Sequence, residues 1–278
     1  MSNIELWRGD CLELMGGISD RSVDLILCDL PYGTTACKWD SVIPFEPMWE
    51  QLNRIIKPNG AICLFGSEPF SSALRMSNIK EYKYDWIWIK NTSAGFIHAK
   101  NMPLKKYETI SVFSLGPMGH LSQLGNKRMV YNPQGLKPCH RIFDGTKTCK
   151  NIIGQRPSHK KEVVSKFENY PINILEFKSE RGLHPTQKPV SLLEYLIKTY
   201  TNEGQTVLDN CMGSGSTGVA CLRNNRNFIG MELEEKYFKI AKNRIEDEIN
   251  KAENHAECEP FWNLSTGETN VGGVHLNV

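Results

Sequence analysis

The chain has 278 residues, of which 40% are hydrophobic and 23% charged, and its formal net charge is +2. A chain of this size and apolar content can bury one substantial core. It has no run of about 18 or more apolar residues, so we expect no membrane span and no membrane partner. The N-terminal segment lacks the basic and apolar regions of a signal peptide, and we expect a cytoplasmic protein.

The first predicted elements are a short strand at residues 4–7, which leads to Asp10, and a short helix near residues 12–14. The next is residues 23–28, Val-Asp-Leu-Ile-Leu-Cys, a short apolar run that suits a central strand of a parallel sheet. In open α/β sheets, ligands bind beyond the carboxyl ends of the strands. The residues that follow this run are therefore candidates for a binding site.

The run ends at Asp29-Leu30-Pro31-Tyr32. Pro31 prevents further strand pairing and fixes a turn. The turn offers a carboxylate, a backbone carbonyl and a phenol ring, which together suit a planar substrate with an exocyclic amine. Taken alone, the motif also fits an ordinary turn at the end of a strand.

Residues 34–41, which carry Trp39, follow as a candidate mobile loop over that turn. Apolar residues at helical spacing predict a helix over 45–56, and Pro58-Asn59-Gly60 ends it. The same criteria predict strands at 61–65, 86–89 and 110–113 and a helix at 69–76.

A basic segment comes next. Between Gly116 and Lys166 there are ten Lys or Arg residues and two acidic residues, a net charge of +8. Frequent prolines and the lack of long apolar runs predict an irregular insertion outside the sheet. Basic side chains on such a surface could neutralise phosphates or could be merely solvated. Seven residues are our candidates for contacts to the phosphates or bases of a nucleic acid: Lys127, Arg128, Arg141, Lys147, Arg156, Lys160 and Lys161.

After the insertion, residues 206–220 predict a strand, a glycine-rich turn and a helix start. Gly213 and Gly215 let the backbone approach a ligand, and a helix N-terminus offers free N–H groups. Glu232, at the end of the next apolar run, is placed to bind a ribose diol. This pattern alone also fits an NAD-type oxidoreductase. Asp209 disfavours that alternative, because it would face a pyrophosphate with a negative charge, whereas a cationic ligand such as S-adenosylmethionine would be attracted to it.

The remaining predicted elements are helices at 190–200, from Ser216 and at 234–250, and a strand at 228–231. Alternating strands and helices predict a doubly wound, mostly parallel α/β sheet. Residues 253–278 predict a C-terminal tail, and 263–278 lack any periodicity. No repeat or heptad predicts an oligomer.

With both motifs in view, the chain resembles the β-group amino-methyltransferases that act on adenine N6 or cytosine N4 in DNA. The resemblance extends over most of the chain, with motifs in one order at residues 9–13, 29–32, 106–113 and 184–189 and in the Gly213 turn. It implies a seven-stranded, permuted Rossmann-like methyltransferase sheet formed by residues 1–115 and 181–252, with a target-recognition insertion at 116–180. It also implies S-adenosylmethionine as cofactor and double-stranded DNA as partner, and it allows for a cognate restriction endonuclease that acts separately.

The resemblance also implies roles for individual residues. Asp29, Leu30, Pro31 and Tyr32 would hold the target base, and Asp10 would meet the cofactor adenine. The other implied cofactor-binding residues are Thr186, Lys188, Asp209, Cys211, Gly213, Gly215, Thr217 and Glu232. Leu30 replaces a usual proline, but the expected role belongs to its backbone carbonyl. Cys211 replaces a usual phenylalanine and removes a possible contact to the cofactor.

In this family an aspartate that opens the target motif goes mainly with adenine, so Asp29 favours adenine N6, with cytosine N4 as the alternative. An RNA amine methyltransferase and a DNA-binding module without activity are less favoured alternatives. The nine cysteines are scattered, and we expect buried free thiols, none of them catalytic. The spacing of Cys139, His140 and Cys149 fits no standard zinc site, so we expect no metal.

Overall fold

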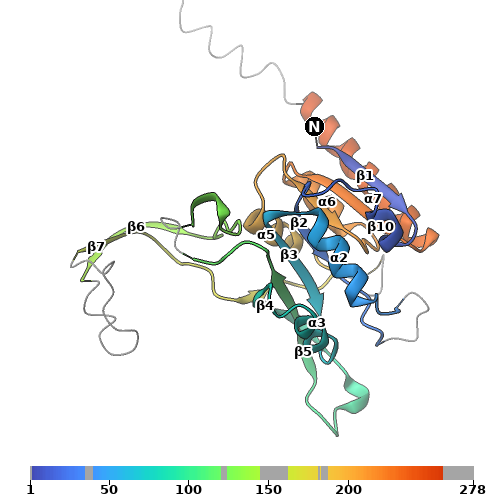
Figure 1. Ribbon diagram of the computed structural model, residues 1–278, viewed down its shortest axis with the longest axis horizontal. Helices are drawn as coiled ribbons and strands as arrows, with labels where there is room; N and C mark the ends of the chain where they lie inside the picture. Colours follow the sequence, from blue (N-terminus) through green and yellow to red (C-terminus); the bar gives the residue numbers. More distant parts are fainter. Residues whose placement is uncertain are drawn as a thin grey trace, which may run out of the picture.

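The computed structural model describes residues 2–34, 40–119, 124–144, 162–180, 182 and 187–258. Over these residues the core is one eight-stranded sheet in the order β1-β10-β9-β2-β3-β5-β4-β8, with helices on both faces (Figure 1). The strands are β1 (Ile4–Arg8), β2 (Val23–Cys28), β3 (Ile56–Gly66), β4 (Tyr82–Ala94), β5 (Lys105–Phe113), β8 (Ile174–Glu176), β9 (Thr206–Asp209) and β10 (Asn227–Glu232). The helices are α1 (Cys11–Met15), α2 (Phe45–Ile55), α3 (Phe70–Ser77), α5 (Val190–Tyr200), α6 (Ser216–Arg223) and α7 (Glu235–Cys258), with 3-10 turns η1 (Phe96–His98) and η2 (Gly125–Lys127).

Alternate residues of β2 explain the two layers of helices. Leu25 and Leu27 pack into one core with α5, α6 and α7, whereas Ile26 and Cys28 pack into a second core with α1, α2 and α3. Every residue of β2 is buried, as a strand covered on both faces requires. The doubly wound α/β class predicted from the sequence is confirmed. Within the described part of the sheet, β5 alone runs antiparallel to its neighbours.

The order of the strands determines where a ligand can bind. β2 pairs with β9 in parallel, with Ile26 opposite Leu208. From β2 the chain continues to β3 on one side, and from β9 it continues to β10 on the other. This reversal is the switch point at which open α/β sheets form a crevice. It brings the turn after β2 and the turn after β9 together at one edge, although they are far apart in sequence.

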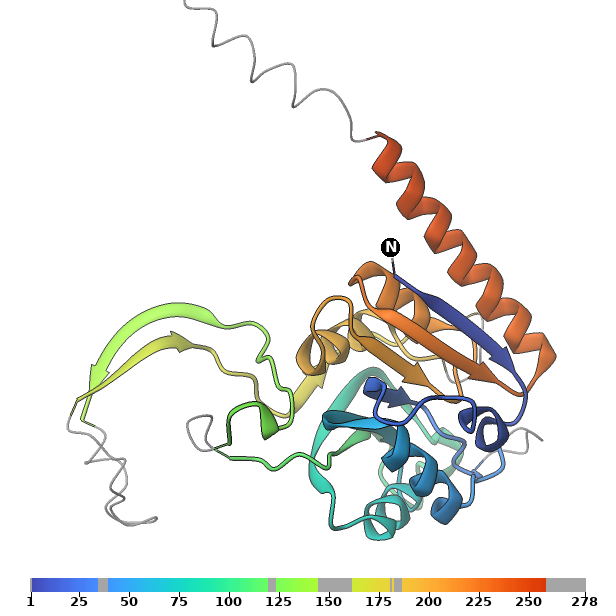
Figure 2. The ribbon, with the colours of Figure 1, turned by 45° about the horizontal axis from the view of Figure 1, so that its top comes forward.

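The basic segment is more regular than predicted. Strands β6 (Lys137–Phe143) and β7 (Val163–Glu168) form an antiparallel ribbon that extends away from the sheet (Figures 1 and 2). β8 pairs with β4 and adds an eighth strand to the expected seven. The prediction of an irregular segment is therefore wrong for β6 and β7, although their ribbon lies outside the main sheet, as predicted. Their residues are mostly exposed, so they lack the apolar alternation that marks a half-buried strand.

At the C-terminal end, α7 continues to Cys258, beyond the predicted end near residue 250. No helix in the described ranges is both long and apolar enough to cross a membrane. Six cysteines are free thiols: Cys11, Cys28, Cys63, Cys139, Cys211 and Cys221.

Candidate active site

A cavity of about 630 Å³ opens at the carboxyl edge of the sheet, across the switch point between β2 and β9. A volume of this size suits a small-molecule ligand or cofactor. Its lining includes residues of both sequence motifs and of the segment before α5: Asp10, Asp29, Leu30, Pro31, Tyr32, Lys188, Asp209, Cys211, Gly213, Thr217 and Glu232. The fold thus gathers eleven of the thirteen predicted catalytic and cofactor-binding residues around one space; Gly215 is not among the lining residues, and Thr186 lies outside the described residues.

Asp29 stands at the centre of a set of polar contacts. Its Oδ1 accepts a hydrogen bond of 2.6 Å from the Tyr32 hydroxyl, and its Oδ2 accepts one from Lys188 Nζ. The Tyr32 ring packs against Phe70 with ring centroids 5.1 Å apart. Both oxygens of Asp29 therefore have a partner within the protein, and each has a second lone pair that can accept a hydrogen bond from a substrate amine.

Lys188 joins Asp29 to a second partly buried acid, Glu108. Its Nζ lies 3.5 Å from Glu108 Oε2, and Glu108 in turn accepts a hydrogen bond from Lys90. Lys188 is only 7% exposed, so its positive charge is neutralised by these two acids rather than by solvent. Burial raises the pKa of Asp29, although the positive charge of Lys188 opposes this shift. Burial also acts to raise the pKa of Glu108, but Lys188 and Lys90 together lower it below its usual value. The cluster Lys90–Glu108–Lys188–Asp29 therefore has two positive and two negative groups.

The glycine-rich turn is shaped for close approach of a ligand. Gly213 and Gly215 have φ values of 54° and 75°, in the left-handed region that favours glycine. A Cβ at Gly215 would lie 3.0 Å from the Ala241 side chain, so glycine also lets α7 pack closely. Asp209 Oδ2 accepts a hydrogen bond of 2.6 Å from the Thr217 hydroxyl, which ties the end of β9 to the start of α6.

Two further acids face this turn. Burial raises the pKa of Asp209 to about 7, against the hydrogen bonds from the Thr217 hydroxyl and the Cys211 N–H. Glu232 accepts 2.9 Å and 2.8 Å hydrogen bonds from the N–H groups of Gly213 and Glu234, and burial raises its pKa. Asp209 is thus held by its own turn, whereas Glu232 ties the end of β10 to the Gly213 turn.

Several buried polar atoms around the cavity have no hydrogen-bond partner in the protein. Among the described residues these include Gln187 Oε1, Asn210 Oδ1 and Ser214 Oγ, and all three residues line the cavity. A buried polar atom without a partner is costly, so such atoms at a cavity wall indicate a polar ligand. This observation fits a cofactor with many hydrogen-bonding groups, such as a nucleoside.

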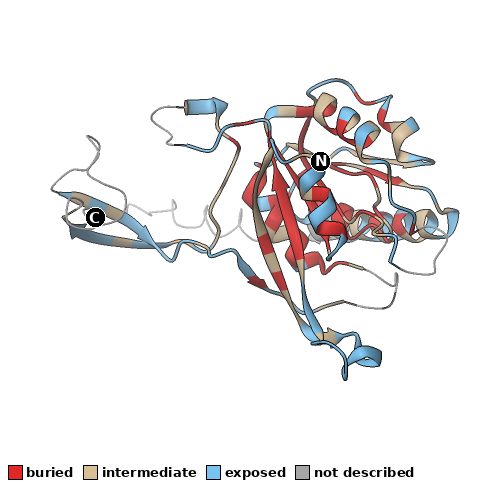
Figure 3. Ribbon diagram, turned by 60° about the horizontal axis from the view of Figure 1, so that its bottom comes forward, coloured by how far each residue is buried: buried red, intermediate tan, exposed pale blue. Residues whose placement is uncertain are grey.

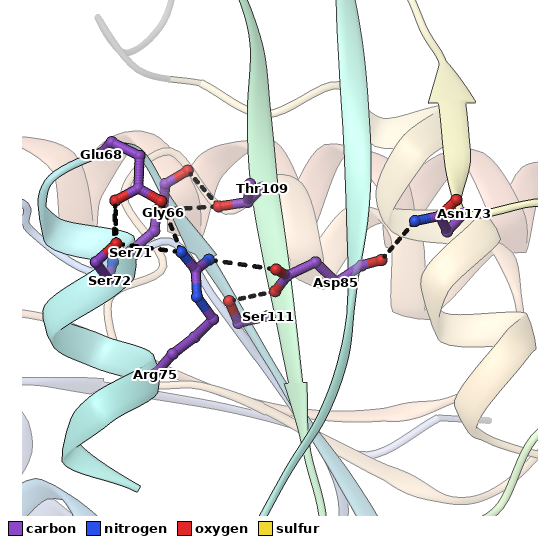
Figure 4. Close-up of polar contacts among 9 residues, drawn as sticks. All are labelled: Gly66, Glu68, Ser71, Ser72, Arg75, Asp85, Thr109, Ser111 and Asn173. Atoms are coloured by element: carbon purple, nitrogen blue, oxygen red, sulfur yellow. Dashed lines mark hydrogen bonds and ion pairs between the residues drawn. The ribbon is translucent and has the colours of Figure 1, made fainter. Parts of the chain in front are cut away.

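The far wall of the cavity includes Glu68, in the turn after β3. Figure 4 shows the contacts that hold it: Arg75 Nη2 donates to Glu68 at 2.6 Å, and Arg75 Nη1 donates to Asp85 at 3.3 Å. Ser111 Oγ donates to the other oxygen of Asp85 at 2.7 Å. The turn is thereby tied to β4 and to β5, the strand that carries Glu108.

Not every predicted residue reaches this site. Thr186, Lys147, Arg156, Lys160 and Lys161 lie outside the described residues, as do residues 35–39 of the predicted loop. Lys127 is exposed on η2, and Arg141 is exposed on the ribbon with Glu168 3.7 Å away. Arg128 lines a separate cavity of about 290 Å³.

Sequence reasoning missed the roles of Lys90 and Glu108 in the charge cluster. Glu108 is the one acid of the strand Lys105–Phe113 and lies where that strand becomes buried, a signal that could have identified it. No group of three or more His, Cys, Asp or Glu residues in the described ranges could hold a metal ion, and the expected absence of a metal site remains a prediction.

Comparison with known proteins gives consistent results. A family model described as a DNA methylase matches residues 23–243. The type II methyltransferase M2.DpnII of Streptococcus pneumoniae is 52% identical over 273 residues, which cover 87% of this chain and 90% of that protein. The type II methyltransferase M.HpaI of Haemophilus parainfluenzae is 26% identical over 254 residues, covering 87% and 74% of the two chains.

Solved structures show the same fold. The M1.HpyAVI–SAM complex is 25% identical, with a TM-score of 0.56, and the match covers 87% of this chain and 99% of that one. The cytosine-N4-specific PvuII DNA methyltransferase has a TM-score of 0.61 at 16% identity, over 90% and 93% of the chains. The latter likeness concerns the fold alone.

Proposed function

The chain belongs to the family of DNA methylases whose model matches residues 23–243, and from that premise we propose that it methylates adenine N6 in DNA. The methyl donor is S-adenosylmethionine, which is also present in the M1.HpyAVI complex. The observation that carries the proposal is the single cavity in which the Asp29 turn and the Gly213 turn meet. The family match decides against the oxidoreductase alternative.

The target base would be held by the turn after β2. An aromatic amine is a weak nucleophile because its lone pair is delocalised into the ring. Hydrogen bonds from the amine to the Asp29 carboxylate and the Leu30 carbonyl would favour a pyramidal nitrogen, and Asp29 would stabilise the positive charge that this nitrogen gains. Tyr32 would stack on the base, and Pro31 would keep the turn rigid. In duplex DNA the base must first leave the helix, at a cost of a few kcal/mol.

The cofactor would occupy the other half of the cavity, where it supplies an electrophilic methyl group. Glu232 would accept hydrogen bonds from the ribose, Asp10 would meet the adenine, and Asp209 would face the cationic end. Ser214 and Asn210 have free hydrogen-bonding capacity for the same ligand. Gly213, Gly215, Cys211, Thr217 and Thr186 complete the proposed cofactor site.

We reassign Lys188 from the cofactor to Asp29. Its Nζ donates to the Asp29 carboxylate and lies 5.2 Å from the Phe65 ring centroid, within the target half of the cavity. A carboxylate buried in this way needs a nearby cation to remain ionised. Lys188 would therefore be a positioning residue that keeps Asp29 charged and oriented.

Adenine is favoured over cytosine by the aspartate that opens the target motif, and both bases present an exocyclic amine. Phosphates of the DNA would be contacted by Lys127, Arg128 and Arg141, and residues 116–180 would form the target-recognition region. Single-molecule sequencing of DNA from a methylation-deficient host that expresses the protein tests these points, with Asp29→Ala as control. Modified adenine at one short sequence supports adenine N6, and modified cytosine assigns the alternative. If neither base were modified while the soluble protein bound S-adenosylmethionine, the proposal would be wrong.

A further inference from the structure

A second feature beside the cavity is the tip of the β4–β5 hairpin, residues 95–104. It extends well beyond the sheet, and in the burial colouring it is almost entirely exposed (Figures 1 and 3). Three large apolar side chains point into solvent here: Phe96 is 70% exposed, Ile97 88% and Met102 59%. Apolar side chains gathered at the end of a projecting hairpin mark an interaction site.

The charge of the hairpin indicates the kind of partner. From Lys90 to Tyr107 the chain has four lysines and His98 and no acidic residue. Of the four, Lys90 is engaged with Glu108, whereas Lys100 in the tip and Lys105 and Lys106 at the base of the hairpin are exposed. The apolar side chains are surrounded by positive charges and by no negative ones. Such a surface suits a polyanion that also has an apolar interior. Duplex DNA, with phosphates outside and stacked bases inside, has that chemistry.

The base of the hairpin is part of the cavity wall, because both Lys105 and Glu108 line the cavity. Ala94 pairs with Lys105, so the tip begins only three residues beyond Glu108, about 10 Å along the strand. The tip is also well formed: His98 N donates to Gly95 O at 2.9 Å, and Met102 N donates to His98 O at 3.0 Å. A shaped apolar tip is thus held close to the Asp29 turn.

A base that turns out of a duplex leaves a gap in the stack, and proteins that distort DNA insert Phe, Ile or Met side chains as wedges between base steps. We propose that the hairpin tip inserts Phe96 and Ile97 into the base stack beside the target base, while Lys100 and Lys106 contact the flanking phosphates. This inference rests on the proposed function. It assigns to the tip the opening of the duplex, and to the Asp29 turn the capture of the freed base.

The first test compares Phe96→Ser/Ile97→Ser with Met76→Ser, a control on α3 whose side chain is also 70% exposed. The substrates are oligonucleotide duplexes that carry the sequence identified by single-molecule sequencing. In one the target base is paired, and in the other it lies opposite an abasic site. We expect the double variant to be slowed at least about tenfold on the paired duplex, because each tenfold in rate corresponds to about 1.4 kcal/mol and unstacking costs a few. On the abasic duplex its rate should return to near that of the wild type, and the control should match the wild type on both.

The second test uses Lys100→Ala/Lys106→Ala and needs no catalysis. Binding to a fluorescent duplex is measured as a function of salt, and two lost phosphate contacts should reduce the slope of log affinity against log salt by about 1.8.

An unchanged slope, together with equal rates for Phe96→Ser/Ile97→Ser and wild type on the paired duplex, would overturn the inference while the proposed function stands. Sedimentation of the wild type and of Phe96→Ser/Ile97→Ser tests another outcome. If the wild type were a dimer, the variant were a monomer and DNA binding were unchanged, the tip would be a self-association surface, which also overturns the inference. If the wild type modified no DNA, the proposed function would fall, and the salt slope would still report whether the tip contacts DNA.

Discussion

The two turns that meet at the cavity differ in how their polar groups are satisfied. In the turn after β2 both oxygens of Asp29 have partners: Asp29 accepts hydrogen bonds from Tyr32 and Lys188, and Lys188 also lies 3.5 Å from Glu108 Oε2. The turn after β9 leaves Asn210 Oδ1 and Ser214 Oγ without partners. Under the proposed function, the first turn would hold a charge for a short-lived contact to the target base, whereas the second would offer open positions to the cofactor. Substitutions should therefore separate rate from cofactor affinity.

The largest expected effect comes from Asp29→Ala. Single-turnover methyl transfer should fall by about 10³-fold or more, because the group that stabilises the developing positive charge is lost. Calorimetry should show S-adenosylmethionine affinity within about threefold of the wild type, since free energy changes below 0.7 kcal/mol are expected for a group that the cofactor does not contact. An equal loss of rate and cofactor affinity would contradict the difference between the two turns.

The second largest effect is expected from Lys188→Met, which should reduce the rate about 10²-fold. Removal of one partner from a buried ion pair costs about 3–5 kcal/mol, and we expect this cost to be divided between stability and function. Asp29 already has a raised pKa from burial, and loss of the cation raises it further. The carboxylate is then protonated over a wider range, so the acid limb of the pH–rate profile should move to higher pH. The other groups that face Asp29, namely Glu108, Tyr32 and Cys28, are unchanged in this variant.

The control for this variant is Lys188→Arg, which keeps the charge and should recover part of the rate and return the acid limb toward its wild-type position. A Lys188→Met profile with an unshifted acid limb would show that the lysine supports only the fold. Cofactor affinity, measured in parallel, should change little in either variant.

A smaller effect is expected from pH at the second turn. Asp209 has a pKa raised to about 7 by burial, and Thr217, Cys211, Cys28 and Asp29 are the groups that act on it. A cationic ligand favours the ionised form, which is lost as pH falls through 7. The dissociation constant for S-adenosylmethionine should therefore rise by up to about tenfold per pH unit below 7. Asp209→Asn should remove this dependence, and a dependence that persisted in the variant would have to arise from another group.

The smallest effect should come from Ser214→Ala. A neutral hydrogen bond contributes about 0.5–1.5 kcal/mol, so cofactor affinity should weaken by roughly two- to tenfold. Because Ser214 Oγ has no partner within the protein, thermal unfolding without cofactor should be unaffected or slightly raised. A clear loss of thermal stability in the absence of cofactor would show that the hydroxyl serves the fold.

Much of the architecture was determined by local sequence. Residues 23–28 are a short apolar run between polar residues, and burial on both faces is the arrangement that such a run favours. The turns at Pro31 and Gly213 also follow from local chemistry, since proline fixes φ and glycine permits positive φ. The sequence therefore predicted the sheet class, most of the strands, and both turns that line the cavity.

Tertiary structure decided what depends on pairing and on distant contacts. β8 is three residues long, and the ribbon strands are mostly exposed, so neither has a local signal; each exists because of the strand beside it. Lys188 lies 159 positions from Asp29, and local chemistry cannot distinguish a lysine that binds a ligand from one that neutralises a buried acid. The same holds for the hairpin tip: local sequence shows that its lysines and apolar residues are present, but their proposed role depends on the position of the tip beside the cavity. Short-range preferences specify elements and turns, but long-range packing determines which charges meet.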